Sequence, residues 1–337
     1  MSTPSFEQAK LYGFIFNGAR EWITPGNMPR LIQDAALITS PNSTVPAELL
    51  AYVDPTVIQI LTAVRNAREV FSEEKRGDWT TPYMKWRANE VTGNTAAYSD
   101  FGHSGKSGTN YEHHTREQYR FQTVIQYGDL EADMASGAKI NLAADKQRAA
   151  ATIIDIDSNK FYLLGVAGRE IYGALNDPNL NPAIAAAPAG EKGSTKWLDK
   201  TTQQRYRDIL NLFARLVNQT QGLVSESDEL ILTISPSLRV QLGDATDFNV
   251  SVMKMLTTYF SKLKIVSLPQ LGGPSGETMQ MIAPKVAGME TGLLGFGEKM
   301  RAGRIVPELS SFSQKFTSTT YGAVIRIPAA IAQMTGM

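Results

Sequence analysis

The chain has 337 residues, which is enough for two compact units or for one domain with long excursions. Its 33 lysines and arginines balance its 33 aspartates and glutamates, so a dedicated DNA-reading domain is not expected, although one face could still be basic. The absence of cysteine excludes disulfides, thiolate metal sites and cysteine nucleophiles.

Residues 1–46 are predicted to form an N-terminal arm rather than a domain, because Pro4, Pro25, Pro29, Pro41 and Pro46 interrupt any long periodic segment. The first residues lack the pattern of a secretory signal, and no window approaches the roughly 18 apolar residues of a membrane span. We therefore expect a protein of the cytoplasm with no membrane partner. The segment 47–74 has apolar residues near helical spacing and predicts one helix.

Residues 79–127 predict two strands around a glycine- and serine-rich tip. In the second part of this segment, apolar or aromatic residues and threonine occupy every second position, at Tyr119, Phe121, Thr123, Ile125 and Tyr127. The tip, 92–110, contains too few large apolar groups to bury itself, so the pair is expected to project and to need a partner surface. The candidate contact residues of the tip are Tyr98, Asp100, Phe101, His103, Lys106 and Asn110.

The same tip contains three residues typical of the end of a phosphate-binding loop, Gly105, Lys106 and Ser107. Asp100 occupies the place of the earlier glycine that such a loop requires, and the following residues alternate as in a strand, so a flexible tip is the better interpretation. All three histidines lie in the predicted hairpin, at 103, 113 and 114. Adjacent residues of a strand face opposite sides, so we expect them to be solvated or intersubunit residues rather than metal ligands.

Residues 139–168 predict a long helix, of roughly 35 Å at about 1.5 Å per residue, with Asn141 as its cap. The predicted buried face consists of Leu142, Ala149, Ile153, Ile156 and Leu163. Asp155 and Asp157 stand two residues apart on this helix, which separates their side chains around its circumference. A paired acid/base site is therefore not expected there, and both are interpreted as surface charges.

The stretch 172–182, "YGALNDPNLNP", follows this helix. The oxygens of Asn176, Asp177, Asn179 and Asn181 could serve calcium, but the stretch lacks the glycine and the distal glutamate of a calcium-binding hand. We predict a turn that binds no ion. The loop 183–195 is expected to be flexible because of its composition.

The segment 201–308 alternates between predicted helices and strands, which indicates a small α/β unit. Helices are expected at 201–220, after Ser235, and at 249–261, and buried strands at 229–234, 263–269 and 278–284. Residues 316–337 predict a final strand that ends at Pro328. Gly295 and Gly297 do not complete a dinucleotide fingerprint. No catalytic, cofactor-binding or metal-binding residues are predicted, because the histidines lie on a mobile tip rather than beside a rigid sheet.

In this order, the parts resemble the major capsid proteins of tailed phages, with the fold first seen in phage Hong Kong 97. The most specific local pieces are "GREIYGALNDPNLNP" (168–182) and "YGAVIRIPAAIAQMTG" (321–336), which are similar to the family's passage into the apical domain and to its closing strand. The resemblance implies an α+β fold with these parts: an N-terminal arm, 1–46; a peripheral domain, 47–78, 128–175 and 309–337, containing a spine helix and the C-terminal strand; an extended β-hairpin loop, 79–127; and an α/β apical domain, 176–308.

The resemblance also implies a structural protein, not an enzyme, that self-assembles through hexamers and pentamers into an icosahedral shell. This shell would enclose double-stranded DNA without sequence specificity. Scaffolding, portal and decoration proteins are the other implied partners, and the implied location is the virion capsid, with synthesis in the host bacterial cytoplasm. Two alternatives stay open: an encapsulin-like compartment shell, and a small-molecule enzyme built on the 200–300 unit. Some family members crosslink through a loop lysine, but no motif transfers that chemistry to Lys106.

Overall fold

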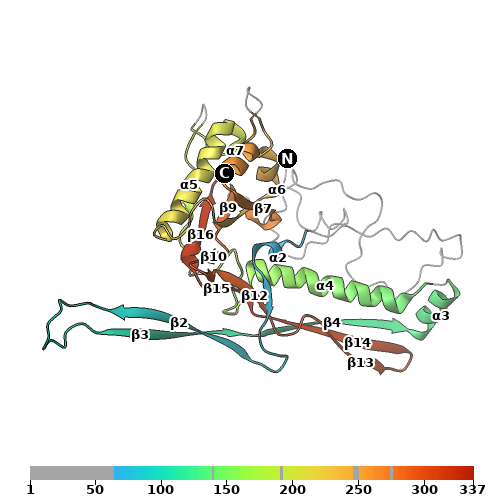
Figure 1. Ribbon diagram of the computed structural model, residues 1–337. Coiled ribbons are helices and arrows are strands. Elements are labelled where there is room, and N and C mark those ends of the chain that lie inside the picture. Colours follow the sequence, from blue (N-terminus) through green and yellow to red (C-terminus); the bar gives the residue numbers. More distant parts are fainter. Residues whose placement is uncertain (1–63, 139, 190–192, 246–249, 274–275) are drawn as a thin grey trace.

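The computed structural model describes residues 64–138, 140–189, 193–245, 250–273 and 276–337. The predicted N-terminal arm, 1–46, and most of the helix expected over 47–74 lie outside these residues. Within them, helices and strands are mixed in the way that the sequence predicts for an α+β fold. Figure 1 shows a long helix above a narrow sheet, an α/β unit above them, and a two-stranded hairpin that projects to one side.

The hairpin consists of β2 (Tyr83–Gly93) and β3 (Ser107–Glu117), which pair antiparallel over all 11 residues of each strand. Most of their side chains are exposed to solvent. The prediction of two long, projecting and poorly buried strands around a tip is therefore confirmed (Figure 1). A two-stranded hairpin without further packing is only marginally stable in water.

The long helix is α4 (Leu142–Leu164), which is continuous over 23 residues as predicted. Asn141 caps it, since its Oδ1 accepts a hydrogen bond from the Ala144 amide at 3.2 Å. The predicted buried face is partly wrong, because Ile153 is 44% exposed whereas Ile154 is 4% exposed. Leu163 is buried as expected, but Leu142 and Ile156 are only half-buried and Ala149 is exposed.

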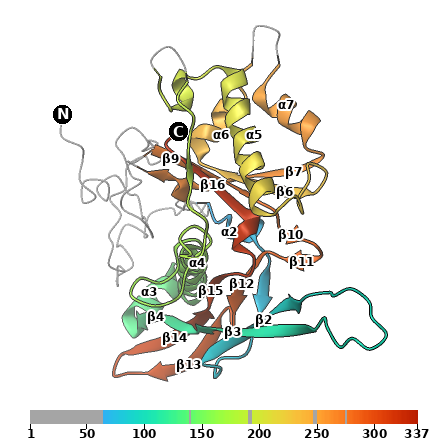
Figure 2. The same cartoon turned by 90° about the vertical axis from the view of Figure 1, so that its left-hand side faces the viewer.

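Three adjacent sheet strands lie along this helix in the order β13 (Arg301–Pro307), β14 (Ser311–Thr320) and β4 (Tyr119–Gly128). Strand β4 alternates as predicted, and its ring residues face the helix: Tyr119 and Phe121 both make edge contacts with Phe161 of α4. A small buried cluster continues this contact with Ile125, Ala150, Ile154 and Phe316. A short helix, α3 (Asp129–Gly137), connects β4 to α4 at the far end of the molecule (Figures 1 and 2).

The α/β unit is built on a sheet in the order β5-β16-β9-β6-β7, with β8 also paired to β9. Its strands are β5 (Ile184–Ala185), β6 (Glu229–Ile234), β7 (Lys262–Ser267), β8 (Gly272–Gly273), β9 (Gly276–Ile282) and β16 (Ile331–Thr335). Its helices are α5 (Thr202–Gln219), α6 (Pro236–Gln241), α7 (Val252–Tyr259) and the short turns η3 (Trp197–Asp199), η4 (Pro269–Leu271) and η5 (Pro328–Ala330). The helices and strands predicted between 201 and 284 are thus present, with ends shifted by up to three residues.

The last strand corrects an expectation. The sequence predicts that 309–337 belong to the peripheral part with a strand ending at Pro328, but β16 follows that proline and pairs antiparallel with β9 in the α/β sheet. Pro328 lacks an amide proton and interrupts the strand, which lets the chain turn through η5 and enter another sheet. The end of the chain therefore completes the α/β unit.

A third sheet joins a strand near the start of the described chain to two strands from its last third. It contains β1 (Glu73–Lys75), β12 (Gly292–Phe296) and β15 (Gly322–Ile325). Before β1, only α2 (Ala67–Val70) is helical within the described part of the segment expected to form one helix over 47–74. A minor hairpin, β10 (Lys285–Val286) with β11 (Met289–Glu290), faces the projecting hairpin. Among the helices of the described ranges, none combines the length and hydropathy needed to cross a bilayer.

Candidate assembly surfaces

The six predicted contact residues lie on or beside the hairpin tip, and all six are exposed. The aromatic pair is the most prominent, because Tyr98 is 90% and Phe101 93% exposed. Tyr98 donates a hydrogen bond to Asp100 Oδ1 at 2.7 Å, and this bond raises the pKa of Tyr98. The structure thus brings the predicted residues together at one end of the molecule, while their contact with a neighbouring subunit stays a prediction.

The tip does not have the structure of a phosphate loop. Ser107 begins strand β3 rather than a helix, so the backbone amides after Lys106 pair with β2 instead of converging on an anion. The tip closes through a hydrogen bond from the Asn94 amide to the Lys106 carbonyl at 3.0 Å. Gly105 has φ +86° at this reversal, a conformation that favours glycine.

The hairpin histidines have separate surroundings. His114 stacks on Trp86 with 5.5 Å between ring centroids, and its Nε2 lies 3.7 Å from Glu112 Oε2. His113 is the neighbour of His114 on an extended strand, so its side chain leaves from the other face. In the ranges that the structure describes, no group of three or more histidine or carboxylate side chains could hold a metal ion.

The turn at 172–182 is attached to the base of the hairpin by a buried ion pair. Arg116 Nη2 lies 3.5 Å from Asp177 Oδ2, and the two side chains are 7% and 1% exposed. Burial outweighs the attraction of Asp177 and lowers the pKa of Arg116. Asp177 Oδ1 also accepts a hydrogen bond from the Asn179 amide at 3.0 Å. The carboxylate that calcium would need is therefore engaged by protein groups.

Asn176 ties the same turn to the end of the spine helix. Its Oδ1 accepts from the Gly173 amide and its Nδ2 donates to the Leu164 carbonyl, both at 2.7 Å. The approach is so close that a Cβ at Gly173 would lie 2.2 Å from the Leu163 carbonyl group. The sequence indicated a turn, but it gave no signal for these partners, because each contact depends on the tertiary approach of α4.

A charged cluster joins α2, β1 and α4. Arg68 donates to Glu73 Oε1 at 2.8 Å and to Asp155 Oδ1 at 2.6 Å, while Lys299 binds the other oxygen of Glu73. Glu73 is partly buried, which opposes its ionisation, but Lys299 and Arg68 outweigh this effect and lower its pKa. Burial, reinforced by Glu73, raises the pKa of Tyr162 beside them. Asp155 is thus a partly exposed charge, as predicted, and it is paired with Arg65 and Arg68.

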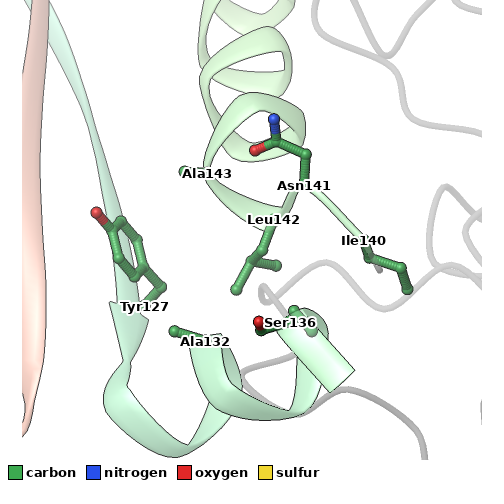
Figure 3. Close-up of a pocket in the computed structure, with 8 residues that line it drawn as sticks. Tyr127, Ala132, Ser136, Ile140, Asn141, Leu142 and Ala143 are labelled. Carbon is green, nitrogen blue, oxygen red and sulfur yellow. The ribbon is translucent and has the colours of Figure 1, made fainter. Parts of the chain in front are cut away.

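A shallow hollow of about 400 Å³ lies between α3 and the start of α4. Figure 3 shows Leu142 pointing from α4 toward Ala132 and Ser136 of α3, with the ring of Tyr127 at one side. On the outer surface of α3, Leu130 is 70% and Met134 48% exposed. This end of the molecule therefore presents apolar side chains to solvent, which is typical of a surface that another protein covers.

Comparison with known proteins identifies a family and a shared fold. The family model described as Pa193 gp26 major capsid protein matches residues 36–336. Among solved structures, the capsid of Myoviridae phage XM1 has a TM-score of 0.71 at 12% identity, covering 88% of this chain and 100% of that chain. The capsid of an empty GTA particle has a TM-score of 0.58 at 10% identity, with 88% and 99% covered.

A further structure, described as Mycobacterium phage Bobi, has a TM-score of 0.54 at 10% identity and covers 85% of this chain and 94% of that chain. At these identities, the structural likenesses establish a shared fold. Comparison with curated proteins gives no match. The proteins described as capsids are structural components of particles.

Proposed function

The chain belongs to the Pa193 gp26 major capsid protein family, and from that membership we propose that its copies assemble into the icosahedral shell of a tailed phage. The observation that carries the proposal is the match over 36–336, which includes the projecting hairpin, the spine helix and the α/β unit. The family favours this function over the encapsulin-like alternative, since its description is that of a major capsid protein.

The hairpin supports a role in assembly, and we propose that its tip contacts a neighbouring subunit. Val91, Tyr98 and Phe101 are 83%, 90% and 93% exposed. Three large apolar side chains are thus exposed to solvent at the end of strands β2 and β3, which bury few side chains themselves. Ordering a backbone costs about 1–2 kcal/mol per residue, which contacts to a second copy would offset. Tyr98, Asp100, Phe101, His103, Lys106 and Asn110 are the proposed contact residues.

We also propose the boundaries of the arm, the hairpin loop, the peripheral part and the apical part as the sequence predicts them, with one change at the C-terminal end. The arm would occupy 1–46, the hairpin loop 79–127, and the peripheral part 47–78 and 128–175, while the apical part would begin at 176. Strand β14 would belong to the peripheral sheet and β16 to the apical sheet, since β14 pairs with β4 and β16 with β9.

The shell would enclose double-stranded DNA without sequence specificity, and its further partners would be scaffolding, portal and decoration proteins. Synthesis in the host bacterial cytoplasm would precede incorporation into the virion. A structural role without catalysis is supported by the family description.

Electron microscopy of the purified full-length protein tests the proposal. We expect closed shells, or tubes and sheets built from hexameric units, and image reconstruction should show the α/β units around the capsomer axes. A protein that stays monomeric at every concentration and ionic strength would contradict the proposal. Closed shells that copurify with a specific enzyme instead of a phage genome would favour a compartment.

A further inference from the structure

A large cleft lies at the base of the projecting hairpin. It has a volume of about 1310 Å³ and runs between β2 and β3 on one side and the β10–β11 hairpin and residues 325–328 on the other. Trp86, Met289, Ile327 and Pro328 supply apolar surface, and Met289 is 61% exposed. The cleft is therefore open, partly apolar and formed by elements that lie far apart in the sequence. Figure 2 shows two of these elements, β2 and β3, beneath the β10–β11 hairpin.

The charged residues that line this cleft are mostly basic. They are Arg87, Arg116, Lys285 and Arg326, with Glu112 and Glu290 as the acidic members. Arg116 is held by Asp177, and Arg326 lies 3.7 Å from Glu290. In the described part of the chain, Arg87 and Lys285 have no carboxylate within ion-pair distance, and both are exposed. The mouth of the cleft thus presents Lys285, and Arg87 stacked on Tyr111 at 4.6 Å, beside apolar surface.

Helix α3 presents the complementary combination. Its sequence, DLEADMASG, contains three acidic residues and no basic residue. Glu131 is buried and bound to Lys146 at 2.7 Å, whereas Asp129 and Asp133 are exposed. Leu130 and Met134, one helical turn apart, are exposed next to these two carboxylates. The outer face of α3 is therefore an apolar pair bordered by negative charge.

Only one face of α3 is available for such a contact, because Glu131 and Ala135 are buried against the same chain. In Figures 1 and 2, α3 lies at the opposite end of the molecule from β2 and β3, whose residues line the cleft. One copy therefore cannot place its α3 in its own cleft.

We propose that α3 of one copy docks into the basic cleft of the next copy, with Leu130 and Met134 on its apolar surface and Asp133 near Lys285 or Arg87. Such a contact joins two different surfaces, and contacts of this kind close into rings or continue as arrays. The inference rests on the proposed assembly function and names a second contact for it, separate from the hairpin tip.

Charge exchange in the full-length protein tests the contact. The variants are Asp133→Lys, Lys285→Glu and Arg87→Glu, followed by the combinations of Asp133→Lys with each of the other two. Asp133 lies beyond the first helical turn, so its replacement leaves the helix end unchanged. Glu226→Lys and Lys254→Glu are matched controls, because both positions are exposed on the α/β unit outside α3 and the cleft. Circular dichroism verifies that each variant is folded.

We expect Asp133→Lys to raise the protein concentration needed for assembly about tenfold, the effect of losing a single favourable charge pair. At least one of the two combinations should return this concentration to within about threefold of the unmodified protein. Leu130→Gln should weaken assembly as well, whereas Leu223→Gln, which replaces a leucine of the α/β unit with similar exposure, should not.

Sedimentation velocity and electron microscopy separate the possible failures. If the unmodified protein assembles and Asp133→Lys assembles as the controls do, or if neither combination restores assembly, the α3 contact is wrong and the shell function stands. If the unmodified protein never assembles, both proposals are wrong.

Discussion

Lys200 and Asp208 form an ion pair that is almost completely removed from water. The Lys200 Nζ lies 2.7 Å from Asp208 Oδ2, and the two side chains are 0% and 3% exposed. The indole of Trp197 donates to the same oxygen at 3.0 Å. Trp197 and Lys200 precede α5, whereas Asp208 lies on it. These contacts therefore hold the segment before α5 against that helix.

Removing one partner of this pair should destabilise the α/β unit strongly. Asp208→Ala leaves the Lys200 ammonium buried without its carboxylate, a change that typically costs about 3–5 kcal/mol. Urea unfolding of the unassembled protein, followed by circular dichroism, measures this loss. Asp199→Ala, at an exposed neighbouring carboxylate, serves as the control and should change the free energy of unfolding by less than about 0.5 kcal/mol. Equal stability of the two variants would contradict the role of the pair.

Glu73 makes the stability of the molecule dependent on pH. Its pKa is lowered from 4.5, because Lys299 and Arg68 outweigh its partial burial. A lowered pKa means that the folded state binds the proton less tightly than the unfolded state. The stabilisation is therefore fully present above pH 4.5 and is lost as the pH falls through the lowered pKa of the folded state.

Glu73→Gln should remove this part of the pH dependence. At pH 7 the variant should be less stable than the unmodified protein, because Arg68 and Lys299 lose their carboxylate. The difference should shrink as the pH falls below 4.5 toward the lowered pKa of Glu73, where the unmodified side chain is itself becoming protonated. Chemical unfolding at several pH values measures both quantities. A difference that is constant from pH 7 to pH 3 would show that Glu73 does not contribute through its charge.

At the scale of elements, packing against the sheet determines which face of the spine helix, α4, is buried. Ile153 and Ile154 are adjacent and equally apolar, but Ile154 is 4% exposed and Ile153 44% exposed. The buried position packs with Ile125 and Phe316, which come from β4 and β14. Leu142, Ile153, Ile156 and Leu163 also lie near helical spacing. The sequence alone is therefore compatible with an apolar face that is rotated about the helix axis from the face that the sheet covers.

The two isoleucines give a matched comparison. Ile154→Ala should cost about 2–5 kcal/mol, since it opens a cavity between α4 and the sheet. Ile153→Ala should cost about 1 kcal/mol or less, because the side chain already keeps much of its contact with water. Thermal and urea unfolding of the unassembled variants measure the two losses. Comparable losses would mean that the helix is rotated relative to the structure described above.

Local signals predicted several elements well. The Asn141 cap, the Ser235–Pro236 start of α6 and the run at 229–234 each depend on a few adjacent residues, and all three are present in the structure. Strand β13 was missed, because its residues, RAGRIVP, are all exposed at a sheet edge and show no alternation of buried side chains. The pairing of β16 with β9 was missed because nothing in residues 331–335 specifies which sheet they join.

At the scale of the whole molecule, the large apolar side chains fall into two groups, those buried in cores and those exposed on the hairpin and on α3. The large core cluster of the α/β unit includes Ile209, Leu212, Leu230 and Leu232, all fully buried, so this unit has what it needs to hold its own fold. The projecting hairpin and the outer face of α3 expose comparable groups to water. The candidate tip could be located from the sequence because it is continuous, whereas the basic cleft joins residues near 87, 116, 285 and 326 and could not.

This division predicts that assembly can be removed while the fold is kept. Deleting residues 98–108 takes away the exposed Tyr98 and Phe101, but it removes nothing from the core cluster of the α/β unit, whose members lie between 184 and 337. The deleted protein should keep the circular dichroism spectrum and the urea midpoint of the unassembled full-length protein. It should also sediment as a small species under conditions in which the full-length protein forms shells.

A double substitution in the intact loop separates the aromatic contacts from the loop length. Tyr98→Ser with Phe101→Ser keeps the reversal at Gly105 and should raise the concentration needed for assembly at least about tenfold, since each buried aromatic anchor typically contributes more than about 1 kcal/mol. Ser99→Ala with Ser104→Ala alters the same tip without removing an apolar group and should assemble normally. Regular closed shells from the deleted protein would mean that the tip makes no necessary contact, and the hairpin strands themselves would then have to carry the intersubunit role.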